Sequence, residues 1–272
     1  DVSSLGPMAG ADTIVLVHGL WMTPLSWEGW IDRFSARGFR VLAPPWPGME
    51  GDVAGLRDDT STYARLHAAR IVDHYAGVIE GLDRPPIVMG HSFGGAFVQL
   101  LLGRGLGAAG VAIDSAPTKG VLSLPLSTIR CTLPILCNPL NRNDAVGLSA
   151  KRFHYAFGNT LSDDESNRVY QRFHVPGVAN VLFAGALANV NPRSPFRVDY
   201  GRADRAPLLF VAGGADHVIP TSTNRANFRK YAASPTLVDY HEFPGRSHYT
   251  VGEKGWEAVA DYALEWAVKN QR

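Results

Sequence analysis

Short apolar runs alternate with longer periodic segments along most of this chain. The short runs carry few charges and close with glycine or proline, which is typical of strands buried on both faces of a parallel sheet. They cover residues 13–19, 39–48, 85–92, 110–117, 206–214 and 237–245. Apolar residues recur at helical spacing over 26–38, 60–82 and 253–270. This alternation predicts an α/β fold with a doubly wound, mostly parallel sheet of about six strands, joined by right-handed crossovers.

One long segment interrupts the rhythm. From about Thr118 to Asp204 no clean strand–helix alternation is visible, and aromatic residues and prolines are frequent. Because an unstructured loop of that length is improbable in a compact domain, we expect a mostly helical insertion over one end of the sheet. We therefore predict a core formed by residues 1–117 and 205–272, with a cap at 118–204 inserted after the fourth predicted strand. A separate small domain is the alternative.

Composition and charge narrow the classes of partner. The chain has 272 residues, 46% of them hydrophobic, and a net charge of +1. This length allows a large core in one domain. No long basic run and no apolar stretch of about 18 residues occurs, so we expect a small-molecule substrate and neither nucleic acid nor a membrane as partner. The first twelve residues lack the features of a secretory signal, which favours a cytoplasmic protein, with a signal removed before residue 1 as the alternative. The oligomeric state stays open, because no heptad or long exposed apolar face is evident in the sequence.

The two cysteines, Cys131 and Cys137, lie close together in the sequence. We favour two buried free thiols over a disulfide, because nothing else marks the chain as secreted. Two thiols without a nearby pair of histidines do not fill a tetrahedral shell, so neither a metal nor another cofactor is expected.

A serine stands between two glycines at the end of the third predicted strand, in the sequence GHSFG at 90–94. This fits G-x-S-x-G, in which a strained strand-to-helix turn exposes a nucleophilic hydroxyl. Side chains with a Cβ would clash at such a bend, which explains Gly90 and Gly94. The helix that follows directs its positive end at the reacting centre. We predict that Ser92 is a nucleophile; a glycine-rich turn with an incidental serine is the alternative.

A serine hydroxyl needs a base at neutral pH, and the base needs a third group to orient it. Of the nine histidines, His248 lies just after the last predicted strand, at the same sheet edge as Ser92. We therefore predict that His248 is the base. His217 and His241 are the alternatives, but His241 lies within a predicted strand and His217 directly follows the best acid candidate.

That acid candidate is Asp216, which follows an apolar strand and two glycines. The carboxyl ends of the strands are where ligands bind in open α/β sheets. Asp114, just past the preceding predicted strand, is the alternative acid. Asp216 could instead cap the helix that begins near Thr221.

Negative charge on a reacting carbonyl oxygen requires backbone N–H donors. We predict an oxyanion hole formed by the amide of Phe93, next to the nucleophile, and the amide of Leu20, in the loop after the first strand. Aromatic residues are candidates for the wall of a substrate pocket, although packing in the core is the alternative for each of them: Trp21, Trp27, Phe153, Phe157 and Phe183.

Taken together, these motifs resemble those of the α/β-hydrolase family. The resemblance rests on LVHGLW, GHSFGG, GGADHVIP and GRSHY, each after a predicted strand and in the family's order Ser, Asp, His. It covers the chain outside the insertion, which occupies the family's usual cap position. Family members often begin with an antiparallel hairpin, but only twelve residues precede Thr13. Because of this departure from the family's pattern, we expect a reduced sheet of six parallel strands without that N-terminal hairpin.

The resemblance and the residues together imply a serine hydrolase. Ser92 would attack a carbonyl, His248 would take and return the proton, and Asp216 would stabilise the imidazolium. A serine nucleophile argues against relatives that open epoxides or displace halide with an aspartate. We expect a small or medium apolar carboxylic ester or lactone as substrate. Hydrolysis of a carbon–carbon bond, a perhydrolase activity and non-catalytic ligand binding are the alternatives.

Overall fold

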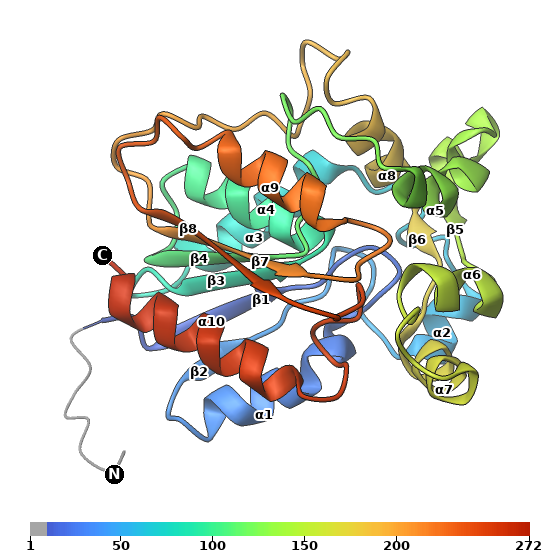
Figure 1. Ribbon diagram of the computed structural model, residues 1–272, viewed down its shortest axis with the longest axis horizontal. Helices are drawn as coiled ribbons and strands as arrows, with labels where there is room; N and C mark the ends of the chain where they lie inside the picture. Colours follow the sequence, from blue (N-terminus) through green and yellow to red (C-terminus); the bar gives the residue numbers. More distant parts are fainter. Residues whose placement is uncertain (1–9) are drawn as a thin grey trace.

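The computed structural model describes residues 10–272 and contains one parallel sheet between helices (Figure 1). Six strands lie in the order β2-β1-β3-β4-β7-β8, and all neighbours are parallel. The predicted fold class, a doubly wound, mostly parallel sheet of about six strands, is confirmed, and residues 10–272 add no antiparallel strand to this sheet. The residues used to argue against a secretory signal lie mostly outside the described residues. The strands are β1 (Thr13–Val17), β2 (Arg40–Leu42), β3 (Ile87–His91), β4 (Ala109–Ile113), β7 (Leu208–Gly213) and β8 (Val238–Phe243).

The central strands are apolar because both of their faces are covered. Every residue of β1, β3, β4 and β7 is buried, whereas edge strand β8 is only partly buried. The other edge strand, β2, is much shorter than the apolar run at 39–48 predicts. Pro44, Pro45 and Pro47 follow it, and proline cannot donate a ladder hydrogen bond.

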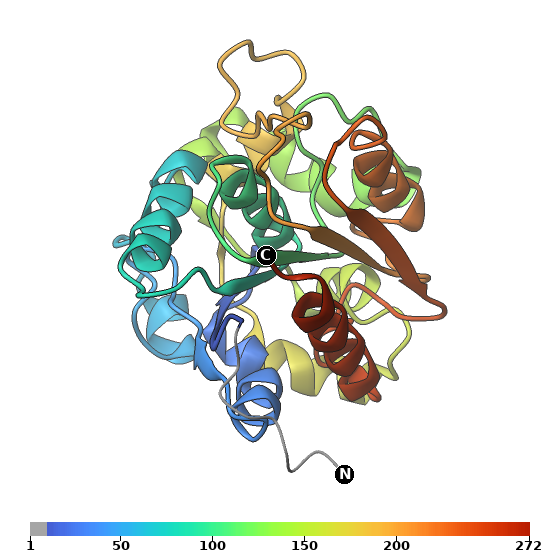
Figure 2. The same cartoon turned by 90° about the vertical axis from the view of Figure 1, so that its left-hand side faces the viewer.

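Helices cover the two faces of the sheet (Figure 2). α1 (Glu28–Ser35) and α10 (Trp256–Asn270) lie on one face, and α3 (Ala68–Glu80), α4 (Phe93–Gly103) and α9 (Thr221–Arg229) lie on the other. Alternate residues of β1 serve the two layers: Ile14 and Leu16 pack in one core cluster, Val15 and Val17 in the other. In residues 10–272, no helix has the length and apolar character needed to span a membrane.

The predicted helix at 60–82 starts later than expected, at Ala68. The residues before it form turns, in which the amides of Tyr63 and Ala64 donate to the Thr60 carbonyl. The Tyr63 hydroxyl donates to Leu56 in α2 (Val53–Asp58), 2.7 Å away. This buried contact fixes the segment as a turn, although its apolar spacing also fits a helix.

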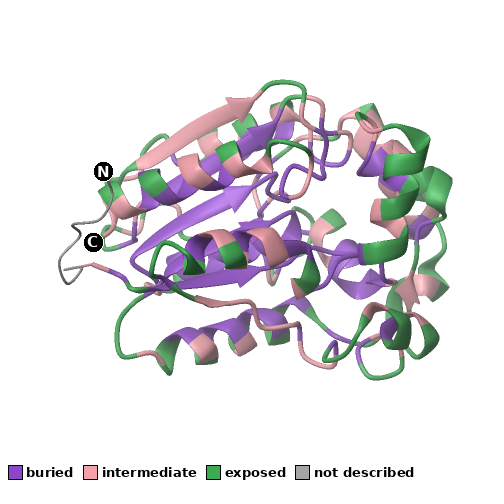
Figure 3. Cartoon of the chain, turned by 90° about the horizontal axis from the view of Figure 1, so that it is seen from below, coloured by how far each residue is buried: buried purple, intermediate pink, exposed green. Residues whose placement is uncertain are grey.

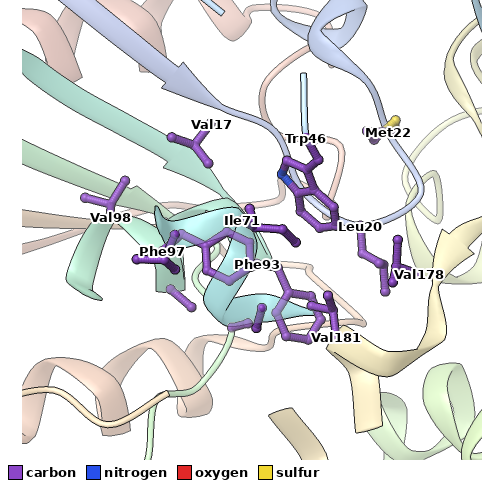
Figure 4. Close-up of a cluster of buried hydrophobic side chains, with 14 of the residues drawn as sticks. Val17, Leu20, Met22, Trp46, Ile71, Phe93, Phe97, Val98, Val178 and Val181 are labelled. Atoms are coloured by element: carbon purple, nitrogen blue, oxygen red, sulfur yellow. The ribbon is translucent and has the colours of Figure 1, made fainter. Parts of the chain in front are cut away.

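The elements from α5 to α8, between β4 and β7, gather at one end of the sheet (Figure 1). They are mostly helical, with a two-residue antiparallel ladder between β5 and β6 that the sequence did not predict. Val178 and Val181 from this segment lie beside Leu20 and Phe93 from the sheet side, in one shared core cluster (Figure 4). The elements are α5 (Leu126–Leu136), η2 (Pro139–Asn143), β5 (Ala145–Val146), α6 (Ala150–Ala156), α7 (Asp163–Phe173), β6 (Gly177–Val178) and α8 (Ala179–Ala186).

Both cysteines are free thiols. Cys131 is buried on α5, as expected, and its sulfur lies 3.8 Å from the His217 carbonyl oxygen. Cys137 is exposed at the end of the same helix. The prediction of two buried thiols is therefore wrong for Cys137, because α5 ends there at the surface.

The turn from β3 to α4 depends on backbones that approach closely. A Cβ on Gly94 would collide with the carbonyl oxygen of Val17, and one on Gly90 would collide with the carbonyl oxygen of Gly94. Both obstacles are main-chain atoms, which cannot move aside without displacing β1 or α4.

Gly94→Ala is therefore expected to lower the free energy of unfolding by about 1–3 kcal/mol through overpacking. Gly77→Ala is the matched control, since an added Cβ there meets nothing within 4 Å on helix α3. This control is expected to stabilise the protein by about 0.5–1 kcal/mol. Urea unfolding of the three proteins measures both effects, and equal stabilities for the two variants would contradict the packing argument.

Candidate active site

Backbone strain in this protein is concentrated at the carboxyl edge of the sheet. Among the described residues other than glycine, Trp21, Ser92 and Asp114 have a positive φ, of 67°, 58° and 43°. They follow β1, β3 and β4, which are neighbours in the sheet. Such conformations cost about 1–3 kcal/mol each and cluster at functional sites.

Ser92 is held rigidly at the turn. Its amide donates to the Ile113 carbonyl at 2.9 Å, and its carbonyl accepts from the Ala116 amide at 3.0 Å. A Cβ on Gly19 would lie 2.8 Å from the Ser92 Cβ, so the loop after β1 packs directly against the serine. Contacts from three strand ends thus define the position of the Ser92 backbone and Cβ.

His248 and Asp216 form a buried pair. His248 Nδ1 lies 2.6 Å from Asp216 Oδ2, and both side chains are fully buried. Asp216 Oδ1 accepts from the amides of Val218 at 2.7 Å and Ile219 at 2.9 Å. The Asp216 carboxylate therefore bonds to the amides of its own loop and to the imidazole. It does not cap helix α9, which begins after Pro220 without a side-chain hydrogen bond at its N-cap.

Burial determines the charge on this pair. It disfavours the imidazolium and lowers the pKa of His248 below its ordinary value. Burial also raises the pKa of Asp216, while the amides of Ile219 and Val218 oppose that rise. With Nδ1 donating to the carboxylate, Nε2 of a neutral His248 carries the free lone pair.

Ser92 and His248 lie in adjacent loops, but no hydrogen bond joins them. Within residues 10–272, the buried Nε2 of His248 has no hydrogen-bond partner. The link between the loops is His91, whose ring lies 4.7 Å from the His248 ring and whose Nε2 donates to the His248 carbonyl at 2.8 Å. Catalytic hydrogen bonds are often long in ligand-free enzymes and tighten in complexes.

The alternative candidates from the sequence have other partners. His217 Nδ1 lies 2.9 Å from the Tyr155 carbonyl oxygen. His241 stacks on Tyr262 at 4.1 Å between ring centroids. Neither histidine is hydrogen-bonded to a carboxylate within the described residues.

Asp114 is a second buried carboxyl group at the same edge. Its Oδ1 accepts from the Gly213 amide at 2.6 Å, while its Oδ2 is buried with no partner in residues 10–272. Burial and the nearby Asp216 raise the pKa of Asp114 well above its ordinary value. Single ligand atoms of Asp114, His91 and His248 lie within 4.8 Å of one another. His91 and His248 each use one ring nitrogen in a hydrogen bond to another group, and no hydrogen bond joins any two of these three side chains.

The raised pKa of Asp114 predicts how stability depends on pH. The folded state favours its protonated form, so the group stabilises fully below its unfolded pKa of about 3.9 and loses that contribution as pH rises. Asp114→Asn imitates the protonated carboxyl group at every pH, so the variant should not lose this stabilising contribution as pH rises. Unfolding free energies of the two proteins are expected to be similar near pH 4 and to diverge above it, with the asparagine variant more stable at pH 7. Parallel stability–pH curves would contradict a neutral Asp114.

The amides of Leu20 and Phe93 are both unpaired. Neither donates a hydrogen bond within the described residues, although both residues are buried. Phe93 is the first residue of α4, and Leu20 follows the glycine that packs on Ser92. Because buried amides are nearly always paired, two unpaired amides beside Ser92 are unusual.

Ser92 lines a cavity of about 440 Å³ between the sheet edge and α5 and α8. Its walls hold no charged residue, and they include Trp21, Phe93, Leu182, Val218 and Ile219. A wider hollow near α1 and α7 contains none of the candidate catalytic residues. The aliphatic residues of this wall were not predicted from the sequence, because their pattern in the sequence does not distinguish them from residues of the core.

Four of the five predicted pocket aromatics do not line this cavity. Trp27 lies in the core on the opposite face of the sheet, with its ring 5.1 Å from Trp30. Phe153 and Phe157 stack on each other at 4.9 Å inside the inserted segment, and Phe183 is buried in the same core cluster. Phe157 nevertheless contacts the site, since its ring packs edge-on against His248 at 4.8 Å.

Comparison with known proteins agrees with this architecture. The model of the alpha/beta hydrolase family matches residues 14–262. The chain belongs to the α/β-hydrolase family. A pyrethroid hydrolase from Sphingobium wenxiniae is 24% identical over 259 residues, which is 92% of this chain and 87% of that protein.

Solved structures of other α/β hydrolases share the fold over nearly the whole chain. An esterase from Thermogutta terrifontis covers 97% of this chain and 92% of its own, with a TM-score of 0.67 and 18% identity. A monoacylglycerol lipase from Paleococcus ferrophilus covers 96% of both chains, with a TM-score of 0.65 and 20% identity. These relatives of the α/β-hydrolase family are hydrolases of the esterase and lipase type.

Proposed function

We propose that this protein hydrolyses small or medium, uncharged carboxylic esters or lactones through Ser92, His248 and Asp216. One observation carries the proposal: a buried His–Asp pair, 2.6 Å apart, lies in the loops beside a strained serine that lines an uncharged cavity. A base oriented by a carboxylate beside a serine is the arrangement required for acyl transfer.

Each residue has a distinct task in the proposed reaction. The Ser92 oxygen attacks the ester carbonyl while His248 Nε2 takes its proton, and Asp216 stabilises the resulting imidazolium. The Leu20 and Phe93 amides donate to the oxyanion, which needs fixed donors rather than mobile water. His248 then protonates the leaving alcohol, and water attacks the acyl-enzyme by the same route.

The cavity supports an apolar substrate without formal charge. A carboxylate or ammonium group would lose its hydration there and find no charged partner among the lining residues. A volume of about 440 Å³ suits a small or medium ligand. The names of the relatives, a pyrethroid hydrolase and a monoacylglycerol lipase, agree with this class.

A panel of p-nitrophenyl esters and lactones tests the proposal. We expect turnover of uncharged acyl chains and much lower kcat/KM for chains that end in a carboxylate or ammonium group. Ser92→Ala, assayed in parallel, is expected to abolish the signal. Absence of turnover on every ester and lactone, or turnover equal to that of Ser92→Ala, would overturn the proposal and leave carbon–carbon bond hydrolysis or ligand binding.

A further inference from the structure

Exposed large apolar residues are concentrated in the inserted segment. Of the nine such residues in the described chain, seven belong to the inserted segment, while Leu25 and Leu237 lie elsewhere. We call the seven the leucine patch: Leu122, Leu124, Leu126, Leu133, Leu140, Leu187 and Val190. Isolated exposed leucines need no explanation, whereas a group of this size on one part of a protein marks an interaction surface.

The patch lies on elements that touch one another. Helix α5 packs on both η2 and α8, and α8 packs on η2. These elements form the end of the molecule beyond the carboxyl edge of the sheet (Figure 1), where the ribbon in Figure 3 has many stretches coloured as exposed. The patch is also continuous with the active site, because Leu122, Leu124 and Val190 are 83%, 80% and 76% exposed and still line the cavity that contains Ser92.

The sequence segments that carry the leucine patch contain basic residues and no acidic ones. Residues 118–143 and 187–193 contain Lys119, Arg130, Arg142 and Arg193 but no aspartate or glutamate, in a chain with 26 basic and 25 acidic residues. None of the four forms a salt bridge within the described residues. Asp144 is the first acidic residue to follow. A basic surface favours an anionic partner, and it disfavours a second copy of the same face.

We propose that the leucine patch docks on the surface of an anionic phospholipid bilayer, with the mouth of the cavity turned toward the lipid. The apolar side chains enter the boundary between headgroups and acyl chains, and the basic residues contact the phosphates. An uncharged ester dissolved in the lipid would then reach the cavity without crossing water, a consequence that rests on the proposed function. Docking itself requires no catalysis.

The sequence predicts no membrane partner because it contains no continuous apolar stretch long enough to span a bilayer. The patch instead combines residues from α5, η2 and the loops at 121–126 and 187–190, separated by polar positions. Only the fold brings them together.

Vesicle co-sedimentation of the full chain tests docking. The vesicles contain phosphatidylcholine with about 30% phosphatidylglycerol, which supplies the anionic surface. We expect wild type and Ser92→Ala to bind equally, and the triple variant Leu126→Ser/Leu133→Ser/Leu140→Ser to partition at least about tenfold less. The matched control, Leu25→Ser/Leu237→Ser, removes two exposed leucines outside the patch and is expected to bind like wild type. Binding should also weaken in about 0.5 M salt, which screens charge.

Several outcomes would overturn the proposal. They are absence of wild-type binding, equal binding of the triple variant, and equal binding to vesicles of phosphatidylcholine alone. A wild-type dimer that the triple variant converts to monomers, without vesicle binding, would assign the patch to self-association instead. Melting temperature and turnover of a water-soluble ester, both expected to be unchanged in the triple variant, show that fold and site are intact. Because Ser92→Ala still binds vesicles, failure of docking and failure of hydrolysis are distinguishable.

Discussion

Replacing Ser92 with alanine is expected to lower kcat for p-nitrophenyl ester hydrolysis by about 10⁴-fold or more, because the attacking oxygen is lost and only binding and oxyanion donors remain. The fold should persist, since alanine keeps the Cβ and the main-chain hydrogen bonds of the turn. Ser35→Ala, which removes a hydroxyl from the exposed end of α1, is the control and should retain full activity.

Ser92→Gly distinguishes the effect of backbone strain on stability from the effect of the lost hydroxyl on activity. This variant should be as inactive as Ser92→Ala, but glycine adopts the φ of 58° without the steric penalty that a Cβ brings. Thermal unfolding is therefore expected to place the glycine variant above the alanine variant. Activity in either variant comparable to that of wild type would contradict the assignment of Ser92.

Asp216→Asn is expected to lower kcat by about 10³- to 10⁴-fold, because an amide cannot hold His248 in the required tautomer or stabilise its cation. Asp114→Asn should leave kcat largely unchanged, since the raised pKa of Asp114 favours the neutral form that asparagine imitates, and its Oδ1 accepts from the Gly213 amide rather than binding His248. Steady-state kinetics on one ester, with circular dichroism to confirm folding, compares the two. The opposite pattern, with Asp114 essential and Asp216 dispensable, would exchange their roles.

The candidate catalytic residues could be predicted from the sequence more fully than the residues that line the cavity. Ser92, Asp216 and His248 each follow a short apolar strand and stand beside glycines, so parallel strands alone predict that they meet at one edge. The choice between Asp216 and Asp114 could not be made in this way, because both follow strands. It depends on which carboxylate reaches the imidazole, and the 2.6 Å contact from Asp216 is a property of the folded loops.

The pocket wall shows why other expectations failed. An aromatic residue in an inserted segment is equally compatible with a wall and with a core, and Phe153 and Phe157 stack in the core. Trp27 lies close in sequence to Trp21, but a short 3-10 turn carries it to the other face of the sheet. Val218 and Ile219 line the cavity and also donate their amides to Asp216, and hydrophobic periodicity predicts neither contact.

The most direct test of the central claim is covalent labelling with a fluorophosphonate, followed by peptide mass spectrometry. The probe reacts with a serine only where a base and oxyanion donors activate it. We predict a single adduct on Ser92, with labelling much slower in His248→Ala and Asp216→Asn. An unlabelled wild type, or an adduct on a different serine, would contradict the account.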